Sequence, residues 1–197
     1  MKREIKPVDI LPLPVYEQVR AAKRAAIRQI KRDRRIEVGP FATFHFENYE
    51  TMWLQIQEML RVEKGGEEQL ADELRAYNPM IPNGLELTAT LMFEIEEETR
   101  RRTILATLGG VENTIELRFA GEVVRGVPEQ DLDYTSADGK ASSVQFLHFP
   151  FTPAQIAKFI TPRQEVILAV THPHYGHMAI LPQNMRQALA GDFVKID

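Results

Sequence analysis

Three histidines near the carboxyl end of the sequence are the side chains best suited to chemistry. They lie in the segment His172-Pro173-His174-Tyr175-Gly176-His177, directly after an apolar stretch. An extended backbone projects His172 and His174 to the same side, and a turn at Gly176 would fold His177 back toward them. Three imidazoles form a ligand set for zinc, copper or iron(II) that leaves one position open for water or substrate. The segment therefore predicts a divalent-metal site at His172, His174 and His177.

A loop of exposed polar side chains is the simpler interpretation of the same histidines. Spacing without hydrogen-bonded partners behind the ligands is weak evidence for a metal. The other two histidines, His45 and His148, lie in predicted strands among aromatic residues. We expect each of these two to be half-buried, with its hydrogen bonds satisfied, rather than to bind a metal.

Acidic side chains offer a second kind of chemistry, because two carboxylates in different environments can act as acid and base. The carboxylates considered are Glu47, Glu58, Glu86 and Glu94, and the guanidinium groups that they could meet belong to Arg35, Arg61 and Arg118. Nothing in the spacing shows that these groups converge. Ion pairs at the edge of a sheet are therefore the expected arrangement.

The sequence contains no cysteine. This excludes disulfides, a thiolate nucleophile, cysteine-bound zinc and any iron–sulfur cluster held by thiolates of this chain. The glycine-rich phosphate and dinucleotide motifs are missing, as are the nucleophile elbow and the metalloprotease motif H-E-x-x-H. No E-x-x-H occurs, so the helical spacing of a ferritin-type di-iron site has no support.

The composition is that of a folded domain without a membrane span. Of 197 residues, 44% are hydrophobic and 26% are charged, which excludes disordered and collagen-like classes. No apolar run approaches the ~20 residues that cross a bilayer, and the basic N-terminus lacks the apolar stretch of a secretory signal. We therefore expect a cytoplasmic protein.

Charge is distributed unevenly along the chain. Residues 1–35 carry 11 of the 24 Lys and Arg but 4 of the 28 Asp and Glu, a net charge of +7, whereas the remainder carries −11. A basic helix over Arg20–Arg35 would suit a nucleic acid or another anionic partner. The preferred interpretation is a helix that faces water or lies on the acidic body, because the field of the whole chain is negative.

The clearest structural pattern lies in Leu85–Glu96, where apolar and polar residues alternate with Met92 as the one break. Alternate side chains of a strand point to opposite faces, so this pattern predicts a long strand with one buried face. The polar face repeats Glu and Thr in a way that solvent alone does not require. We expect this face to line a groove or to contact the helix predicted over Asn48–Glu63.

The remaining patterns predict an α+β fold, in which helices cover a twisted, mainly antiparallel sheet. A single domain over residues 1–197 is expected, and a helical N-terminal lobe over residues 1–82 is the variant left open. Asn48 and Thr152 are predicted to cap the helices that follow them. Glu165–Thr171 is apolar on both faces and predicts a central strand, and residues 128–142 predict an exposed loop.

Several short phrases of the sequence are distinctive when they are taken together. The phrases include Val38-Gly39-Pro40, Phe46-Glu47-Asn48, Gln55-Ile56-Gln57-Glu58-Met59, Tyr77-Asn78-Pro79-Met80-Ile81-Pro82, Glu86-Leu87-Thr88-Ala89-Thr90-Leu91, Ser142-Ser143-Val144 and His172-Pro173-His174-Tyr175. Together these phrases resemble a bacterial family known only as domain of unknown function 3501, and the resemblance extends from Asp9 to the last helix. It carries no established activity and therefore assigns no catalytic residue.

What the resemblance implies is an association with redox metabolism, because members of that family are encoded near rubrerythrin-like and cysteine-rich iron–sulfur proteins. The first functional hypothesis is thus an accessory or binding protein with a rubrerythrin-like or iron–sulfur partner in redox or oxidative-stress metabolism. The alternatives are a metal-dependent enzyme that uses the three histidines and a nucleic-acid-binding protein that uses the basic helix. No membrane partner is expected, and a homodimer is left open.

Overall fold

The computed structural model describes residues 2–130 and 133–194. The helices of this part of the chain are α1 (Leu13–Arg32), α2 (Tyr49–Glu63), α3 (Gly66–Tyr77), α4 (Glu98–Leu105), α5 (Pro153–Ile160) and α6 (Gln183–Ala190). The strands are β1 (Arg35–Val38), β2 (Ala42–Phe46), β3 (Glu86–Phe93), β4 (Ile115–Phe119), β5 (Glu122–Arg125), β6 (Val127–Pro128), β7 (Val144–Pro150), β8 (Ile167–His172) and β9 (Tyr175–Ile180). No helix within these described ranges has the length and apolar character that crossing a membrane requires.

The strands form two antiparallel sheets, which confirms the predicted α+β class. One sheet has the order β1-β2-β3-β7-β6 and the other has the order β5-β4-β8-β9. The alternating stretch at residues 85–96 contains β3, which is the middle strand of the five-stranded sheet. The apolar stretch at residues 165–171 contains most of β8, which lies between β4 and β9, as predicted for a central strand.

Division into two sheets is the feature that the sequence pattern did not predict. The chain passes from β5 in one sheet to β6 in the other at Gly126, whose N–H donates to the carbonyl of Ile115 at 2.8 Å. A Cβ atom at Gly126 would lie 3.2 Å from the ring of Phe149. A side chain at this crossing would therefore press on Phe149, and a hairpin pattern alone does not show which sheet the next strand joins.

The larger hydrophobic core lies between the two sheets. Its members from the five-stranded sheet include Phe44, Phe46, Leu87, Ala89, Leu91, Leu147 and Phe149, and its members from the four-stranded sheet include Ile115, Leu117, Val124, Leu168 and Val170. At one end of this core, Phe151 packs against Phe119, Phe159 and Phe193 with ring centroids 4.9–5.7 Å apart. These aromatic contacts attach α5 and the chain end after α6 to the sheets.

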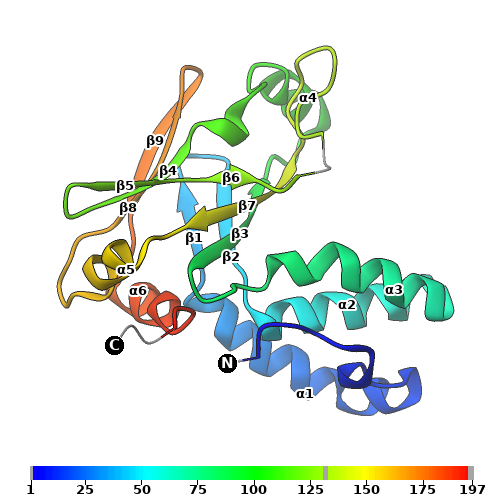
Figure 1. The fold of residues 1–197 in the computed structure, drawn as a ribbon. Helices are drawn as coiled ribbons and strands as arrows, with labels where there is room; N and C mark the ends of the chain where they lie inside the picture. The colour runs from blue at the N-terminus through cyan, green and yellow to red at the C-terminus, as the bar shows by residue number, and fades with distance from the viewer. Residues whose placement is uncertain (1, 131–132, 195–197) are drawn as a thin grey trace.

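Helices α1, α2 and α3 lie side by side on the other face of the five-stranded sheet (Figure 1). A second hydrophobic cluster lies within this layer and contains Ile5, Tyr16, Ile27, Met52, Trp53, Ile56, Met80 and Ile81. Strands β1 and β2 fall within residues 1–82 but belong to the five-stranded sheet. The helices therefore form a layer of the structure that is joined through the sheet to the rest of the chain.

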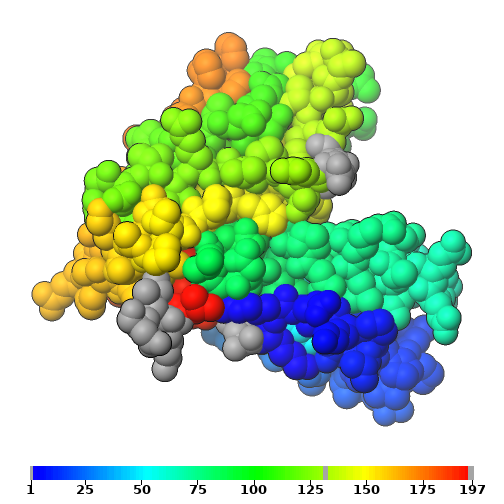
Figure 2. Space-filling view, viewed as in Figure 1, coloured from blue at the N-terminus to red at the C-terminus, as the bar shows by residue number. Residues whose placement is uncertain are grey.

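The N-terminal segment, in blue, runs along the surface of this helical layer (Figure 2). The N–H of Ile5 donates to the side-chain oxygen of Asn78 at 2.8 Å, and the amide nitrogen of Asn78 donates back to the carbonyl of Ile5 at 3.0 Å. Arg3 donates to the carbonyl of Pro82 at 2.7 Å. These contacts attach the segment to the turn that precedes β3.

Both predicted helix caps are present. The side-chain oxygen of Asn48 accepts from the N–H of Thr51 at 3.0 Å, and the hydroxyl of Thr51 accepts from the N–H of Asn48 at 2.9 Å. Thr152 caps α5 in the same manner, with its hydroxyl accepting from the N–H of Gln155 at 3.3 Å. Each side chain satisfies a backbone donor that the helix itself leaves unpaired.

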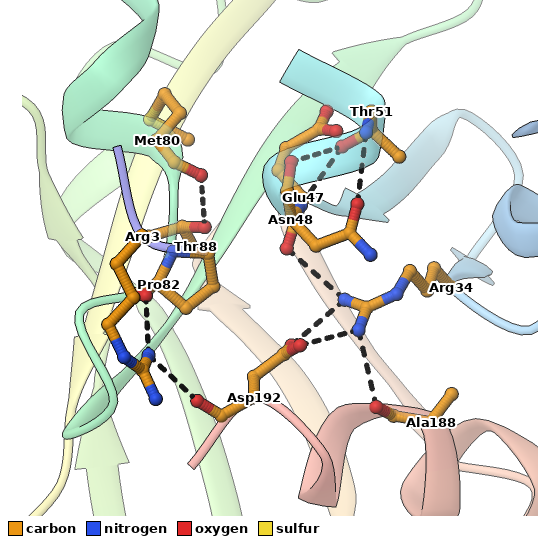
Figure 3. Close-up of polar contacts among 10 residues, drawn as sticks. All are labelled: Arg3, Arg34, Glu47, Asn48, Thr51, Met80, Pro82, Thr88, Ala188 and Asp192. Carbon is orange, nitrogen blue, oxygen red and sulfur yellow. Dashed lines mark hydrogen bonds and ion pairs between the residues drawn. The ribbon is translucent and has the colours of Figure 1, made fainter. Parts of the chain in front are cut away.

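A buried ion pair joins the helical layer to the end of the chain (Figure 3). Arg34 donates to both carboxylate oxygens of Asp192 at 2.6 and 2.9 Å, and the two side chains are only 5% and 1% exposed. Burial raises the pKa of Asp192, and the guanidinium of Arg34 opposes that rise. Arg34 also donates to the backbone carbonyls of Glu47 at 3.1 Å and Ala188 at 3.2 Å. One side chain thus connects the entry to β1, the end of β2 and α6.

Replacing Arg34 by Met should lower the free energy of unfolding by about 3–5 kcal/mol, because the carboxylate of Asp192 would remain buried without its partner. Urea denaturation followed by circular dichroism measures this difference. Arg35→Met is the matched control, since Arg35 is 41% exposed and its ion pairs contribute about 1 kcal/mol or less. Equal losses in the two variants would contradict a central role for the buried pair.

Candidate functional site

The histidine segment lies at the hairpin between β8 and β9. His172 is buried, and its Nδ1 atom accepts from the backbone N–H of His174 at 3.2 Å. The ring proton is therefore assigned to Nε2, which donates to the carbonyl of Gly109 at 3.3 Å. Both nitrogens of His172 are engaged in contacts that hold the hairpin.

The three histidines are not brought together around one point. The rings of His172 and His174 lie 5.8 Å apart, whereas the ring of His177 packs on Tyr175 and over Gly39. Within residues 2–130 and 133–194, no group of three or more His, Cys, Asp or Glu side chains is arranged to hold a metal ion. The metal site at His172, His174 and His177 stays a prediction.

Tyr175 gives this segment a structural role that links the two sheets. Its hydroxyl accepts from the backbone N–H groups of Phe41 and Ala42, both at 2.9 Å, and donates to the carbonyl of Val38 at 2.8 Å. The turn between β1 and β2 is thereby held by one side chain from β9. Gly39 lies in this turn with φ of 71°, and a Cβ atom there would meet the ring of His177 at 2.5 Å. The phrases Val38-Gly39-Pro40 and His172-Pro173-His174-Tyr175, which both belong to the family resemblance, are thus in direct contact.

His148 lies between two carboxylates on the polar face of the five-stranded sheet. Its Nδ1 atom is 3.1 Å from Glu86 and its Nε2 atom is 2.8 Å from Glu129. Burial lowers the pKa of His148, but the hydrogen bonds to Glu86 and Glu129 and their charges outweigh burial and raise the pKa overall. His148 is therefore half-buried and satisfied, as predicted.

The other acidic residues considered above form separate contacts. Glu94 accepts from Thr43 at 2.5 Å and pairs with Arg35 at 3.2 Å, which is the predicted kind of ion pair at a sheet edge. Glu58 pairs with Arg20 of α1 at 2.7 Å. The hydrogen bond from Arg20 holds the pKa of Glu58 at about 2. Part of the positive charge of α1 is thus paired with α2 within the protein.

A cavity of about 250 Å³ lies between the polar face of the five-stranded sheet and the helices. It is lined by Lys31, His45, Glu47, Met52, Gln55, Tyr77, Thr90, Met92, Val144 and Phe146. The sequence alternation on β3 places Thr90 and Met92 on this face, and α2 contributes Met52 and Gln55. This confirms that the polar face of β3 lines a groove and faces the helix after Asn48.

Two polar atoms of the cavity residues lack a partner. Among the described residues, four buried side-chain nitrogen or oxygen atoms have no hydrogen-bond partner, and two of the four are His45 Nε2 and Glu47 Oε2. Glu47 is only 4% exposed, so water reaches its carboxylate poorly. A buried polar group without a partner costs about 1–3 kcal/mol, and more when it is charged. Both side chains line the same cavity, which marks it as the candidate site.

The backbone fixes the position of Glu47. It follows the last residue of β2, its N–H donates to the carbonyl of Thr88 at 2.9 Å, and its carbonyl accepts from Arg34. On the side chain, Oε1 accepts from the hydroxyl of Thr90 at 2.8 Å, which leaves Oε2 free. The residue is thus held through its backbone and through Oε1, whereas Oε2 has no hydrogen-bond partner.

The ring of His45 lies in the electrostatic field of Glu47. It lies two residues before Glu47 on the same face of β2, directly opposite Thr90 in the sheet. Burial lowers the pKa of His45, although the charge of Glu47 opposes that effect. The imidazole is therefore neutral near pH 7. The prediction of a fully satisfied His45 is wrong for Nε2, because only the packing of α2 on the sheet shows which ring atoms are covered.

These features define an α+β protein with two antiparallel sheets and a ligand-sized cavity beneath a helical layer. The chain belongs to the family described as protein of unknown function (DUF3501), whose model matches residues 4–193. Its fold is similar to the crystal structure of a novel protein of unknown function from Burkholderia pseudomallei K96243. That similarity has a TM-score of 0.89 at 34% sequence identity and covers 96% of this chain and 99% of that chain. No curated protein matches the chain.

Replacing Tyr175 by Phe should lower the free energy of unfolding by about 3 kcal/mol, because three backbone groups of the β1–β2 turn lose their partner. The control is Tyr77→Phe, which removes a hydroxyl whose contact with Gln55 is 3.4 Å long. That control should cost less than about 1 kcal/mol. Urea denaturation compares the two variants. A Tyr175→Phe variant as stable as Tyr77→Phe would contradict the role of Tyr175 in holding the β1–β2 turn.

Removing His148 should have an effect that depends on pH. Its pKa is raised in the folded protein above the ordinary 6.5, so its stabilising contribution is complete below about 6.5 and is lost as pH rises through the folded value. The difference in unfolding free energy between the wild type and His148→Gln should therefore be larger at about pH 6 than at about pH 9. Urea denaturation at both pH values measures it.

The same pair of measurements on His174→Gln is the control, because His174 is an exposed histidine of the β8–β9 turn. A difference for His148→Gln that stays constant, or that grows with pH, would show that the two carboxylates do not favour the protonated ring.

Proposed function

We propose that this protein binds a small organic molecule in the cavity between the five-stranded sheet and α2. The observation that carries the proposal is that His45 and Glu47, which line one cavity, each have a buried side-chain atom without a hydrogen-bond partner. Folded proteins pair nearly all of their buried polar atoms, and exceptions concentrate at sites of function. A ligand with hydrogen-bonding groups would supply the two missing partners.

The lining of the cavity supports a ligand with an apolar body. Met52, Met92, Val144 and Phe146 provide apolar surface beside the few polar groups. A cavity with apolar walls and a small number of placed polar atoms is the usual form of a small-molecule site. Methionine side chains also adapt to ligands of different outline. The volume of about 250 Å³ suits a compound of modest size.

The proposal is limited to binding, because it assigns the polar residues of the cavity hydrogen bonds to a ligand and no step of a reaction. Thr90 donates its hydroxyl proton to the carboxylate of Glu47, and this bond helps to hold the carboxylate in position. A binding role agrees with the first hypothesis from the sequence. A redox partner, a metal-dependent activity, nucleic-acid binding, a homodimer and a cytoplasmic location stay predictions from the sequence.

A fragment screen monitored by methyl NMR tests the proposal. With methionine methyl groups labelled, a ligand in the cavity should shift the signals of Met52 and Met92 and leave that of Met178, which is 62% exposed on β9, unchanged. Val144→Trp would place an indole into the cavity from its edge. This variant should therefore abolish the shifts at Met52 and Met92 without unfolding the protein.

Circular dichroism and the unchanged Met178 signal would show that the Val144 variant is folded. A screen of a few hundred compounds in which none shifts both cavity methionines would contradict a binding role. Shifts that persist in Val144→Trp would place the ligand elsewhere.

A further inference from the structure

The cavity presents hydrogen-bond acceptors to a ligand more than donors. The hydroxyl proton of Thr90 is used in the bond to Glu47 at 2.8 Å, so Thr90 has only oxygen lone pairs to offer. The free Oε2 atom of Glu47 is an acceptor. The neutral ring of His45 also accepts at Nε2 when its proton is on Nδ1. A group with two or three N–H bonds would complete all of these at once.

The charge of the cavity also favours a ligand that donates hydrogen bonds. Glu47 is 4% exposed and receives a neutral hydroxyl rather than a cation on its carboxylate. A buried carboxylate in this state is stabilised most strongly by a charge-assisted hydrogen bond from a positively charged donor. The nearby guanidinium of Arg34 does not donate to the carboxylate of Glu47, because it binds the backbone carbonyl of Glu47 and the carboxylate of Asp192.

Aromatic and sulfur-containing side chains complete the surroundings. Tyr77 and Phe146 both line the cavity, and their rings meet edge to face with centroids 6.4 Å apart. Two rings at such an angle form a corner that accommodates the body of an aromatic or aliphatic amine, and their faces attract positive charge. Met52 and Met92 add polarisable surface.

Lys31 is the one lining residue that opposes a cation. It lies in the last turn of α1 and is only partly buried, so its long side chain can turn its ammonium group toward water. Glu47 cannot move in this way, because its backbone and one of its oxygens are held. The buried charge is screened less than the partly exposed one, so the carboxylate governs the cavity.

We propose that the natural ligand is an organic ammonium compound with an apolar body, and that Glu47 binds its positively charged nitrogen. The proposal rests on the proposed function, since it specifies the ligand class of the same cavity. The nitrogen would pair with the carboxylate of Glu47 beside His45, and the body would lie against Tyr77 and Phe146. An anionic ligand of the same size would meet the unscreened charge of Glu47 and be rejected.

Three probes of similar size separate charge from shape: 2-phenylethylamine, which is cationic near neutral pH, neutral 2-phenylethanol and anionic 3-phenylpropionate. Isothermal titration calorimetry near pH 7 should show that the amine binds at least about tenfold more tightly than the alcohol, with no binding of the acid. In Glu47→Gln the preference for the amine should disappear, because the amide keeps the shape of the carboxylate without its charge.

Glu94→Gln is the control, since Glu94 is a carboxylate on the same sheet that lies outside the cavity lining and is 46% exposed. This variant should retain the preference for the amine. The comparison of the three probes on the wild type keeps the test decisive even if Glu47→Gln does not fold.

The outcomes separate the two proposals. Equal binding of the amine and the alcohol, with shifts at Met52 and Met92, would overturn the ammonium class and leave the binding role intact. Tighter binding of 3-phenylpropionate than of the amine would also overturn the ammonium class. A preference for the amine that survives in Glu47→Gln would remove Glu47 from the site. If no probe binds and the fragment screen is also negative, the binding role itself fails.

Discussion

The buried contact between Arg34 and Asp192 is the interaction on which the arrangement of the layers depends. It joins residues 158 positions apart in the sequence at distances of 2.6 and 2.9 Å. Such a pair tolerates little displacement, because each charge has lost its water and relies on the other. The same guanidinium binds the backbone carbonyl of Glu47. A contact that closes the fold therefore also sets the position of the residue central to the candidate site.

The protein has three layers: the helices α1, α2 and α3, the five-stranded sheet and the four-stranded sheet. The candidate site lies between the helices and the five-stranded sheet. The five-stranded sheet packs its apolar face on the second sheet and turns its polar face toward α1, α2 and α3. An apolar face can be covered completely, whereas a face that carries Glu, Thr and His must find partners for each polar atom. Most of these atoms are paired, as for His148 between Glu86 and Glu129. The unpaired remainder at His45 and Glu47 is the feature that distinguishes the cavity.

The histidine segment shows how a chemically suggestive pattern can serve packing. Tyr175 holds the β1–β2 turn, His177 covers Gly39, and both ring nitrogens of His172 support the hairpin. The hydroxyl of one tyrosine satisfies three backbone groups that the turn leaves unpaired. Spacing along the chain revealed that these residues share a short segment. It could not reveal that the carbonyl bound by Tyr175 lies 137 positions away along the chain.

The sequence alone determined the local features: the alternation that forms β3, the caps at Asn48 and Thr152, and the antiparallel α+β class, because each depends on neighbouring residues. It also indicated that the polar face of β3 has a partner. Tertiary structure decided the division into two sheets at Gly126, the buried pair Arg34–Asp192 and the packing of the helices that forms the cavity over His45 and Glu47. These depend on contacts between distant segments, and whether a polar atom is left unpaired is known only when every surrounding element is in place.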